Sequence, residues 1–185
     1  MYSAYLKHTH RRIMRKLSLK KKDEVLDVSA GTGMLAEGIL SEFGPFKRLV
    51  LNDPSKGMLE KAKYRLRYHK DLEYTSDFSE ELSFREDTFT KIICLNSFRY
   101  YTDHPTVLSH FRRMLKPDGH LYILSWNRVG FFRIINWVIG LISGHALNTR
   151  SLDEMKELLK ESGFTIEEEE TWRFRWWNFF FIKCK

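Results

Sequence analysis

Short apolar runs alternate with longer amphipathic segments along this chain. Four of the runs have the length and apolar content of buried strands: residues 24–28, 48–51, 91–95 and 120–124. The segments between them space their apolar residues as helices do. Because strands separated by helices build a mostly parallel sheet covered on both faces, the pattern predicts one α/β domain over residues 1–185.

Two of the predicted helices have clear ends. Pro105 suits a first helical position, and Pro117 with Gly119 ends that segment. Farther along, Ser151 and the glutamate three residues later form a capping-box pattern, and Gly163 closes that helix. The last two apolar runs, residues 164–168 and 176–184, are predicted to pair as an antiparallel hairpin at the sheet edge.

Composition narrows the class of protein. With 185 residues and 43% hydrophobic content, the chain suits one domain with a full core. Its first residues lack the apolar run of a secretory signal, and it has two cysteines, Cys94 and Cys184. We therefore expect a cytoplasmic chain in a reducing compartment, without a disulfide framework.

The formal net charge of +7 is concentrated near the start, where eight Lys and Arg residues fall within residues 7–22. Such a patch could meet RNA or anionic lipid. The simpler alternative is a solvated amphipathic helix with Ile13, Leu17 and Leu19 turned inward, and we favour it.

The chemistry is concentrated in the first strand and the loop after it, residues 25–35. Gly31, Gly33 and Ala36 have the spacing of a dinucleotide fingerprint, and Asp53 follows where a carboxylate would reach ribose hydroxyls. Small residues let the backbone approach a ligand, and the helix start offers free N–H groups. This spacing alone does not choose between NAD and S-adenosylmethionine (SAM).

Asp27 decides between the two cofactors. A charged residue in a buried first strand is costly, and a dinucleotide fold usually has an apolar residue at that point. The segment resembles the first motif of class I SAM-dependent methyltransferases, of the type that includes ubiquinone and menaquinone methyltransferases. The resemblance implies that Asp27 helps to hold the methionine end of SAM.

Three further segments, in the same order as in that family, extend the resemblance. Residues 49–62 resemble its second motif, which implies that Asp53 binds both ribose hydroxyls and that Met58 lies near the adenine. Asp77 and Phe78 are similar to the family's next acidic motif and would meet the adenine amino group and ring. Residues 115–121 match the turn before its fifth strand.

The family implies a Rossmann-like, doubly wound, mostly parallel seven-stranded sheet with helices on both faces and an antiparallel last strand. The resemblance also places the carboxyl ends of the first, second and fourth strands around SAM. The predicted cofactor-binding residues are Asp27, Ser29, Ala30, Gly31, Gly33, Asp53, Pro54, Met58, Asp77, Phe78, Asn96 and Ser97. Three positions depart from the family pattern: Ser29 replaces a glycine, Thr90 an aspartate, and Asp118 a glycine.

Structural alternatives stand beside these roles. Asp53 could cap the helix that follows it, and Asp77 could be a turn residue. Asp27 could be a core acid bonded to a backbone donor, and Asn96 with Ser97 a simple strand-terminal turn. In the same way, the side chains predicted to meet adenine could be ordinary core.

No catalytic residue identifies itself, and no metal site is predicted. Tyr5, Tyr100, Tyr101 and His104 lie on segments expected to border the site. His104 has a suitable pKa for a general base, but a histidine at a helix start is more often structural.

An apolar insertion over residues 128–150 is predicted to form a lid or another part of the acceptor side. It carries Arg133, Asn136 and several glycines, and a crossing would separate the last strands from their sheet, so we reject a transmembrane reading. An apolar lid favours a small hydrophobic acceptor. A buried helix or a homodimer contact explains the insertion equally well, and peripheral membrane contact stays open.

The sequence therefore predicts a SAM-dependent methyltransferase acting on a small, apolar acceptor. One alternative keeps the fold but methylates RNA or protein through the basic patch, although we consider nucleic acid the weaker partner. Others are a non-catalytic SAM-binding interaction module and an NAD-dependent oxidoreductase. Asp27 and the turn at residues 115–121 argue against the oxidoreductase.

Overall fold

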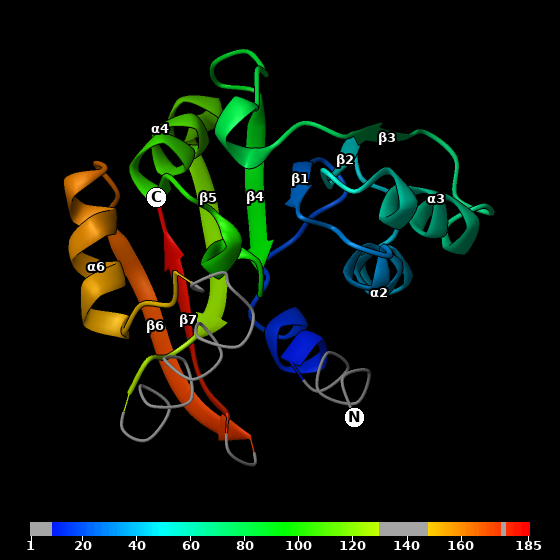
Figure 1. Ribbon diagram of the computed structural model, residues 1–185. Helices are drawn as coiled ribbons and strands as arrows, with labels where there is room; N and C mark the ends of the chain where they lie inside the picture. Colours follow the sequence, from blue (N-terminus) through cyan, green and yellow to red (C-terminus); the bar gives the residue numbers. More distant parts are fainter. Residues whose placement is uncertain (1–8, 130–147, 175–176) are drawn as a thin grey trace.

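The computed structural model describes residues 9–129, 148–174 and 177–185, which form one seven-stranded sheet with helices on both faces (Figure 1). The strand order is β3-β2-β1-β4-β5-β7-β6. The strands are β1 (Glu24–Val28), β2 (Arg48–Asn52), β3 (Leu72–Thr75), β4 (Phe89–Leu95), β5 (Leu115–Trp126), β6 (Ile166–Phe174) and β7 (Trp177–Cys184). The helices are α2 (Met34–Phe43), α3 (Lys56–Arg65), α4 (His104–Met114) and α6 (Leu152–Glu161), with short 3-10 turns η1 (Ser79–Glu81) and η2 (Phe98–Tyr100).

The sheet is parallel except at its last strand. β1 pairs in parallel with β2 and β4, and the parallel pairing continues to β3 on one side and β5 on the other. β7 pairs antiparallel with both β5 and β6, so it alone runs against the other strands. The predicted Rossmann-like fold with an antiparallel last strand is confirmed.

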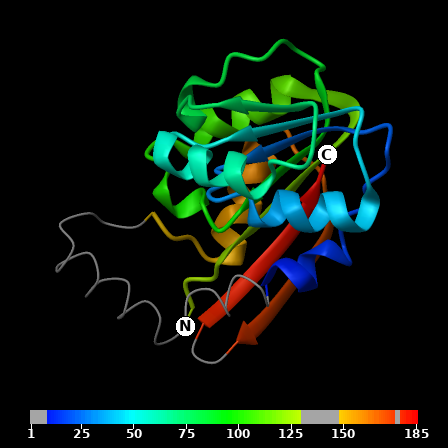
Figure 2. The ribbon, with the colours of Figure 1, turned by 90° about the vertical axis from the view of Figure 1, so that its right-hand side faces the viewer.

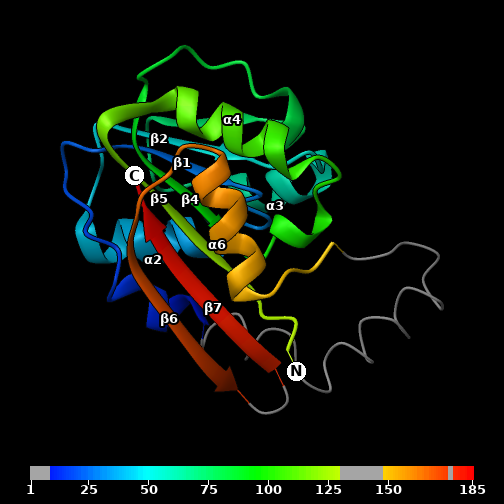
Figure 3. The same cartoon turned by 90° about the vertical axis from the view of Figure 1, so that its left-hand side faces the viewer.

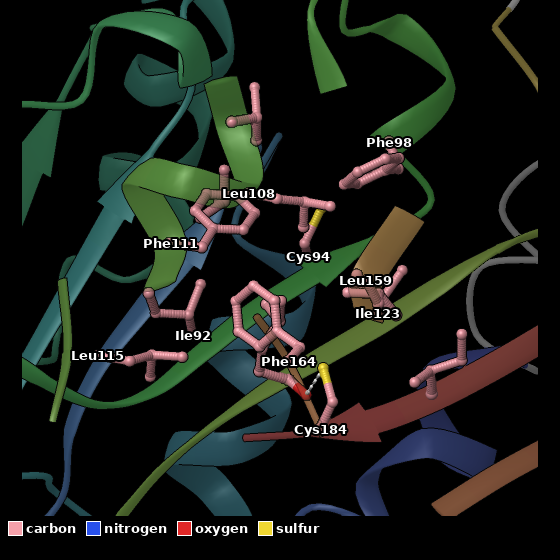
Figure 4. Packing of buried hydrophobic residues seen from close by; sticks show 14 of the residues in the cluster. Ile92, Cys94, Phe98, Leu108, Phe111, Leu115, Ile123, Leu159, Phe164 and Cys184 are labelled. Atoms are coloured by element: carbon pink, nitrogen blue, oxygen red, sulfur yellow. Dashed lines mark hydrogen bonds between the residues drawn. The ribbon is translucent and has the colours of Figure 1, made fainter. Parts of the chain in front are cut away.

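Two apolar layers cover the sheet. On one face, α4 and α6 bury Val107, Phe111 and Leu159 against the strands, and Figure 4 shows Leu108, Phe111 and Leu159 meeting Ile92 and Ile123 in one cluster. Figure 3 shows these two helices in front of the sheet with α2 behind it. Burial of this size is the main favourable term that holds such a fold together.

The opposite face is covered by α2, α3 and the N-terminal helical segment at residues 9–14 (Figure 2). Ile13, Leu17 and Leu19 are all buried there, which confirms the amphipathic interpretation of the basic segment. Two cations of this segment form ion pairs with glutamates of β6. Arg12 pairs with Glu170, and Lys16 pairs with both Glu168 and Glu170. Part of the basic patch is therefore neutralised within the fold.

Helix boundaries follow local chemistry. Ser151 caps α6 through a complete capping box, as predicted. Its side chain accepts from the backbone N–H of Glu154, and the side chain of Glu154 accepts from the backbone N–H of Ser151. α4 ends at Met114, earlier than Pro117 and Gly119 suggest. The reason is a pairing between Phe89 and Leu115, so that β5 begins there and the next residues bulge out of register.

Two other predicted boundaries change. The strand expected at residues 164–168 is β6, which runs to Phe174 because it pairs with β7 along its whole length. The final strand begins at Trp177 in the described residues. Most of the insertion predicted at 128–150 lies outside the described residues, although its ends are bonded together: the N–H of Arg128 donates to the carbonyl of Arg150 at 3.1 Å. Across the described parts of the chain, no helix is both long and apolar enough to cross a membrane.

Candidate functional site

A cavity of about 770 Å³ opens at the carboxyl ends of β1, β2 and β4. This is the topological switch point of the sheet, since β1 lies in the middle and the chain turns to opposite sides from it to reach β2 and β4. Its volume falls within the usual range of small-molecule sites. Of the predicted cofactor-binding residues, the walls include Ser29, Ala30, Gly31, Asp53, Pro54, Met58, Phe78, Asn96 and Ser97.

The loop after β1 adopts a conformation that suits small residues. Ser29, Gly31 and Gly33 all have positive φ values, of 58°, 58° and 72°. The turn is held against β2 by the N–H of Ala30, which donates to the carbonyl of Asn52 at 2.8 Å. A Cβ atom added to Gly31 would meet nothing within 4 Å, so the loop leaves space beside its backbone. The spacing of the fingerprint therefore produces the open loop that a ligand needs.

Gly33 has a different role from Gly31. It is the N-cap of α2, and a Cβ atom at this position would lie 3.1 Å from the Cβ of Ala62 on α3. Gly33 does not line the cavity. It lets α2 and α3 approach closely, which places the loop and the start of α3 side by side.

Ser29, where the family pattern has a glycine, is joined to the opposite wall. Its Oγ lies 3.0 Å from the hydroxyl of Tyr101, which lies 3.1 Å from Oγ of Ser97 and 3.4 Å from Sγ of Cys94. These four side chains link the loop after β1 to the segment after β4. Burial raises the pKa of the Cys94 thiol to about 11, so it is not a reactive thiolate.

Asp53 follows β2 and organises two loops at once. Its Oδ2 accepts from the N–H of Gly31 at 2.9 Å, and its Oδ1 accepts from the N–H of Ser55 at 2.9 Å. It does not cap α3, because Ser55 is the N-cap and accepts from the N–H of Met58. Each carboxylate oxygen can accept a further bond, so the side chain is oriented and still able to bind two hydroxyl groups.

Asp27 lies directly behind the loop and is 2% exposed. It does not line the cavity, and its Oδ2 makes no hydrogen bond to any residue that the structure describes. Burial, with a smaller contribution from the nearby charge of Asp53, raises the pKa of Asp27 to about 8. A cation placed in the cavity would favour the ionised form of this group.

Met58 and Phe78 line the cavity with exposed fractions of 39% and 59%. The alternative that they are ordinary core is therefore wrong. Asp77 is exposed and does not line the cavity; its carboxylate accepts from Thr75, and its carbonyl accepts from the side-chain amide of Asn52 at 2.8 Å. The turn alternative describes its present contacts, although it is adjacent to Phe78.

The carboxyl end of β4 forms the third wall. Asn96 has a positive φ of 62°, and its N–H donates to the carbonyl of Leu124 at 2.7 Å. Ser97 begins the 3-10 turn η2. A residue other than glycine in this conformation is uncommon and directs the chain sharply at the edge of the cavity.

The structure separates the candidate general bases. His104 has both ring nitrogens engaged, because Nε2 lies 2.9 Å from the carbonyl of Phe98 and Nδ1 lies 2.8 Å from Nε of Arg150. It is a structural residue. Tyr101 lines the cavity, but burial holds the pKa of its hydroxyl well above the usual value. Tyr5 lies outside the described residues.

His10 is a cavity residue that sequence reasoning missed. It lines the same cavity, burial lowers its pKa to about 4, and its buried Nδ1 has no hydrogen-bond partner among the described residues. One signal was available, since His10, Ile13 and Leu17 recur at the spacing of a single helix face. That face points inward in the fold.

Together these walls differ in chemistry. The carboxyl group of Asp53 and an open loop lie on the β1 and β2 side, whereas Met58, Phe78 and Tyr100 add apolar surface, with Glu80 and Glu81 beside Phe78. Tyr100 is 61% exposed. The cavity can therefore hold a polar, partly cationic molecule next to an apolar one.

Comparison with known proteins agrees with this geometry. A sequence model described as a methyltransferase domain matches residues 2–169. The demethylmenaquinone methyltransferase of Thermotoga maritima is 32% identical over 169 residues, covering 80% of this chain and 72% of that protein. A ubiquinone/menaquinone biosynthesis C-methyltransferase of Haemophilus ducreyi is 27% identical, covering 79% and 66%. A protein of the same name from Francisella philomiragia is 33% identical, but the alignment spans only 46% of its length.

Solved structures show the same fold at lower identity. A SAM-dependent methyltransferase from Mesorhizobium loti has a TM-score of 0.79 and 16% identity, with 94% of this chain and 95% of that chain covered. The [4+2]-cyclase SpnF has a TM-score of 0.81 and 14% identity, covering 96% and 80%. Because one fold carries different activities, function must be argued from the site.

Proposed function

The chain belongs to the methyltransferase domain family, and on that basis we propose that it transfers a methyl group from SAM to a small, hydrophobic acceptor. It is a SAM-dependent methyltransferase, and SAM is its cofactor. The observation that supports the finer proposal is the cavity at the switch point, whose lining combines polar groups with the apolar side chains of Met58, Phe78 and Tyr100.

The inner walls fit the cofactor. We propose that the two oxygens of Asp53, held by backbone N–H groups, accept the ribose hydroxyls, while Met58 and Phe78 enclose the adenine. The open backbone at Gly31 leaves room for the methionine part, and the buried carboxyl of Asp27 provides negative potential behind it. We assign Ala30, Pro54, Asn96 and Ser97 to the same wall. Asp77 keeps its predicted adenine role only if its side chain leaves Thr75.

When bound, SAM supplies a methyl group already activated on a sulfonium, so that a nucleophile displaces it in line. The protein's contribution is to align the two molecules and to keep water out. The segment after β4 is suited to this task, because the hydrogen bonds of Tyr101 to Ser29 and Ser97 tie the acceptor side to the cofactor loop. A fixed distance between the two sides follows from these contacts.

We assign His10 to acceptor binding. Its imidazole is neutral above about pH 5, because burial lowers its pKa to about 4. A group with so low a pKa is a weak base, but a neutral imidazole can exchange a hydrogen bond with a polar atom of the acceptor through Nδ1, which has no partner among the described residues. Replacing His10 by Phe should raise KM for the acceptor about tenfold and change kcat less.

The acceptor proposal comes from an exposed ring of the cavity lining and from the relatives. Tyr100 lines the cavity and is 61% exposed, so its ring would contact an apolar molecule there. The relatives named above are, by name, methyltransferases of quinone biosynthesis. We therefore expect an aromatic diol with an alkyl chain to be a better acceptor than the same diol without it.

Transfer of radioactive methyl from SAM to such diols tests the proposal. The Asp53→Asn variant should weaken SAM binding about a hundredfold in calorimetry. The amide has no negative charge, and it replaces one hydrogen-bond-accepting carboxylate oxygen by an NH2 group that donates. Asp118→Asn, at an exposed position in the bulge of β5, is the matched control and should bind normally. SAM binding without transfer to any diol would contradict the acceptor class, and normal binding by Asp53→Asn would contradict the cofactor assignment.

RNA is the weaker acceptor in light of the fold. Arg12 and Lys16 of the N-terminal segment already form ion pairs with Glu170. A phosphate backbone would have to compete with those carboxylates. Methyl incorporation into RNA but not into any diol, under the same conditions, would reverse this ranking.

A further inference from the structure

The last turn of α3 and the turn that follows it carry two tyrosines that lie outside the core. Tyr64 is on α3 and is 72% exposed, and Tyr68 lies three residues past the end of the helix and is 82% exposed. The guanidinium of Arg67 lies 4.5 Å from the centre of each ring. The two rings and this cation therefore form one exposed cluster.

The same segment is strongly basic. Residues 56–70 contain six Lys or Arg residues and one acid, Glu60. Lys63 pairs with Glu60, and Arg65 pairs with Glu37. Within the described parts of the chain, the other four cations form no ion pair: Lys56, Lys61, Arg67 and Lys70. We call these four cations with Tyr64 and Tyr68 the α3 patch.

The two basic regions of the chain therefore differ in the fold. The N-terminal region, which the sequence singles out by its run of charge, has two of its cations bound by Glu170. Like those of the α3 patch, the other described cations of this region are exposed: Arg11, Arg15, Lys20, Lys21 and Lys22. What distinguishes the α3 patch among the described residues is that two exposed tyrosine rings stand among its cations.

The α3 patch adjoins the cofactor cavity. A groove of about 620 Å³ between α2 and α3 is lined by Lys61, Tyr64 and Arg67 together with Thr32 and the ion-paired residues Glu37, Glu60 and Arg65. Thr32 also lines the large cavity, and its carbonyl accepts from Nε of Arg65 at 2.8 Å. Figure 1 shows α3 beside β2 and the edge strand β3, away from α4 and α6. The groove and the cavity thus meet at one loop residue.

We propose that the α3 patch docks the protein on an anionic membrane surface. Four unpaired cations complement lipid phosphate groups, and each basic residue close to such a surface adds to binding. Tyrosine rings lie at the level of lipid headgroups, where their apolar part is buried and the hydroxyl stays in water.

Docking through α3 has a geometric consequence. The helix begins at the cavity wall, where Ser55 and Met58 lie, and ends in the patch. A membrane bound along its outer face would therefore lie beside the cavity. The proposal rests on the patch alone, and it stands whether or not the acceptor is an apolar molecule.

Co-sedimentation with lipid vesicles tests the proposal on the full chain. We expect binding to vesicles that contain phosphatidylglycerol, little binding to pure phosphatidylcholine, and loss of binding as salt increases. The variant Arg67→Glu/Lys70→Glu should bind at least about tenfold more weakly. Tyr64→Ser/Tyr68→Ser should also weaken binding, with less dependence on salt.

The matched control reverses the same charge at the other basic region. Lys21→Glu/Lys22→Glu changes two exposed cations near the N-terminus and should keep the binding within about twofold of the parent protein. All variants should bind SAM normally, which shows that each is folded. Equal loss in both charge variants, or loss in the N-terminal variant alone, would overturn the proposal, as would a parent protein that binds RNA but not the anionic vesicles.

Discussion

The buried carboxyl of Asp27 leads to a prediction in which stability and binding change in opposite directions. In the folded protein its pKa is raised from 3.8 to about 8, mainly by burial. The folded state therefore holds this proton more tightly than the unfolded chain does. Stability contributed by the protonated form is lost as the pH rises from about 4 towards 8, because the unfolded chain ionises freely over that range.

The size of the effect follows from the pKa difference. Each pKa unit corresponds to about 1.4 kcal/mol, so ionising Asp27 in the fold costs on the order of 5 kcal/mol at pH 8. Asparagine does not titrate, but its buried amide retains a desolvation cost of about 1–3 kcal/mol. We expect Asp27→Asn to be more stable than the parent protein by about 2–4 kcal/mol at pH 8. At about 2–4 °C per kcal/mol for a chain of this length, Tm should rise by roughly 4–16 °C.

Thermal unfolding at several pH values between 5 and 8, without SAM, measures this difference. The gap in Tm between Asp27→Asn and the parent protein should widen as the pH rises, whereas exposed Asp118→Asn should follow the parent throughout. The same Asp27→Asn variant should bind SAM about tenfold more weakly, because the negative potential behind the loop is gone. If the two Tm curves run parallel across this range, the carboxyl is not held in its neutral form and the reasoning fails.

Other predictions test the frame around the site. Gly33→Ala should lower the free energy of unfolding by about 2 kcal/mol, because a positive φ and a Cβ contact of 3.1 Å to Ala62 both oppose the methyl group; urea unfolding measures it. Ser151→Ala removes the cap of α6 and should cost about 1 kcal/mol, seen as a fall in Tm of 2–4 °C. Thr90→Val should cost about 1–2 kcal/mol, because it leaves the buried carboxylate of Asp23 without the hydroxyl that donates to it at 3.0 Å; a Thr90→Ser variant should recover most of that loss.

Much of the fold could be predicted from local patterns. The alternation of apolar runs and amphipathic segments located the strands, and the capping box located the start of α6. Boundaries were less accurate where partners decide them. β5 begins at Leu115 because Phe89 pairs with it, and β6 extends to Phe174 because β7 is long enough to pair with it.

The sequence predicted which residues lie at the cavity where they directly follow a strand, and it missed residues that come from elsewhere. Asp53 and Gly31 lie one residue or a few residues past a strand end, so their place follows from the parallel sheet. His10 comes from a helix that folds across the cavity, and its role depends on packing that no motif encodes. His104 was expected to be structural because it lies at a helix start, and the contacts of both its ring nitrogens agree with that expectation.

By itself the sequence determined the alternation of strands and helices, the open loop after β1 and the carboxylate after β2, because these depend on spacing within short segments. Only the tertiary structure decided which charges are free. Arg12 and Lys16 meet an acidic strand more than 150 residues away in the sequence, whereas Arg67, in the turn after α3, forms no ion pair within the described residues. Burial and pairing are set by distant parts of the chain coming together, and the same cause gives Asp27 its raised pKa and Phe78 its place at the cavity mouth.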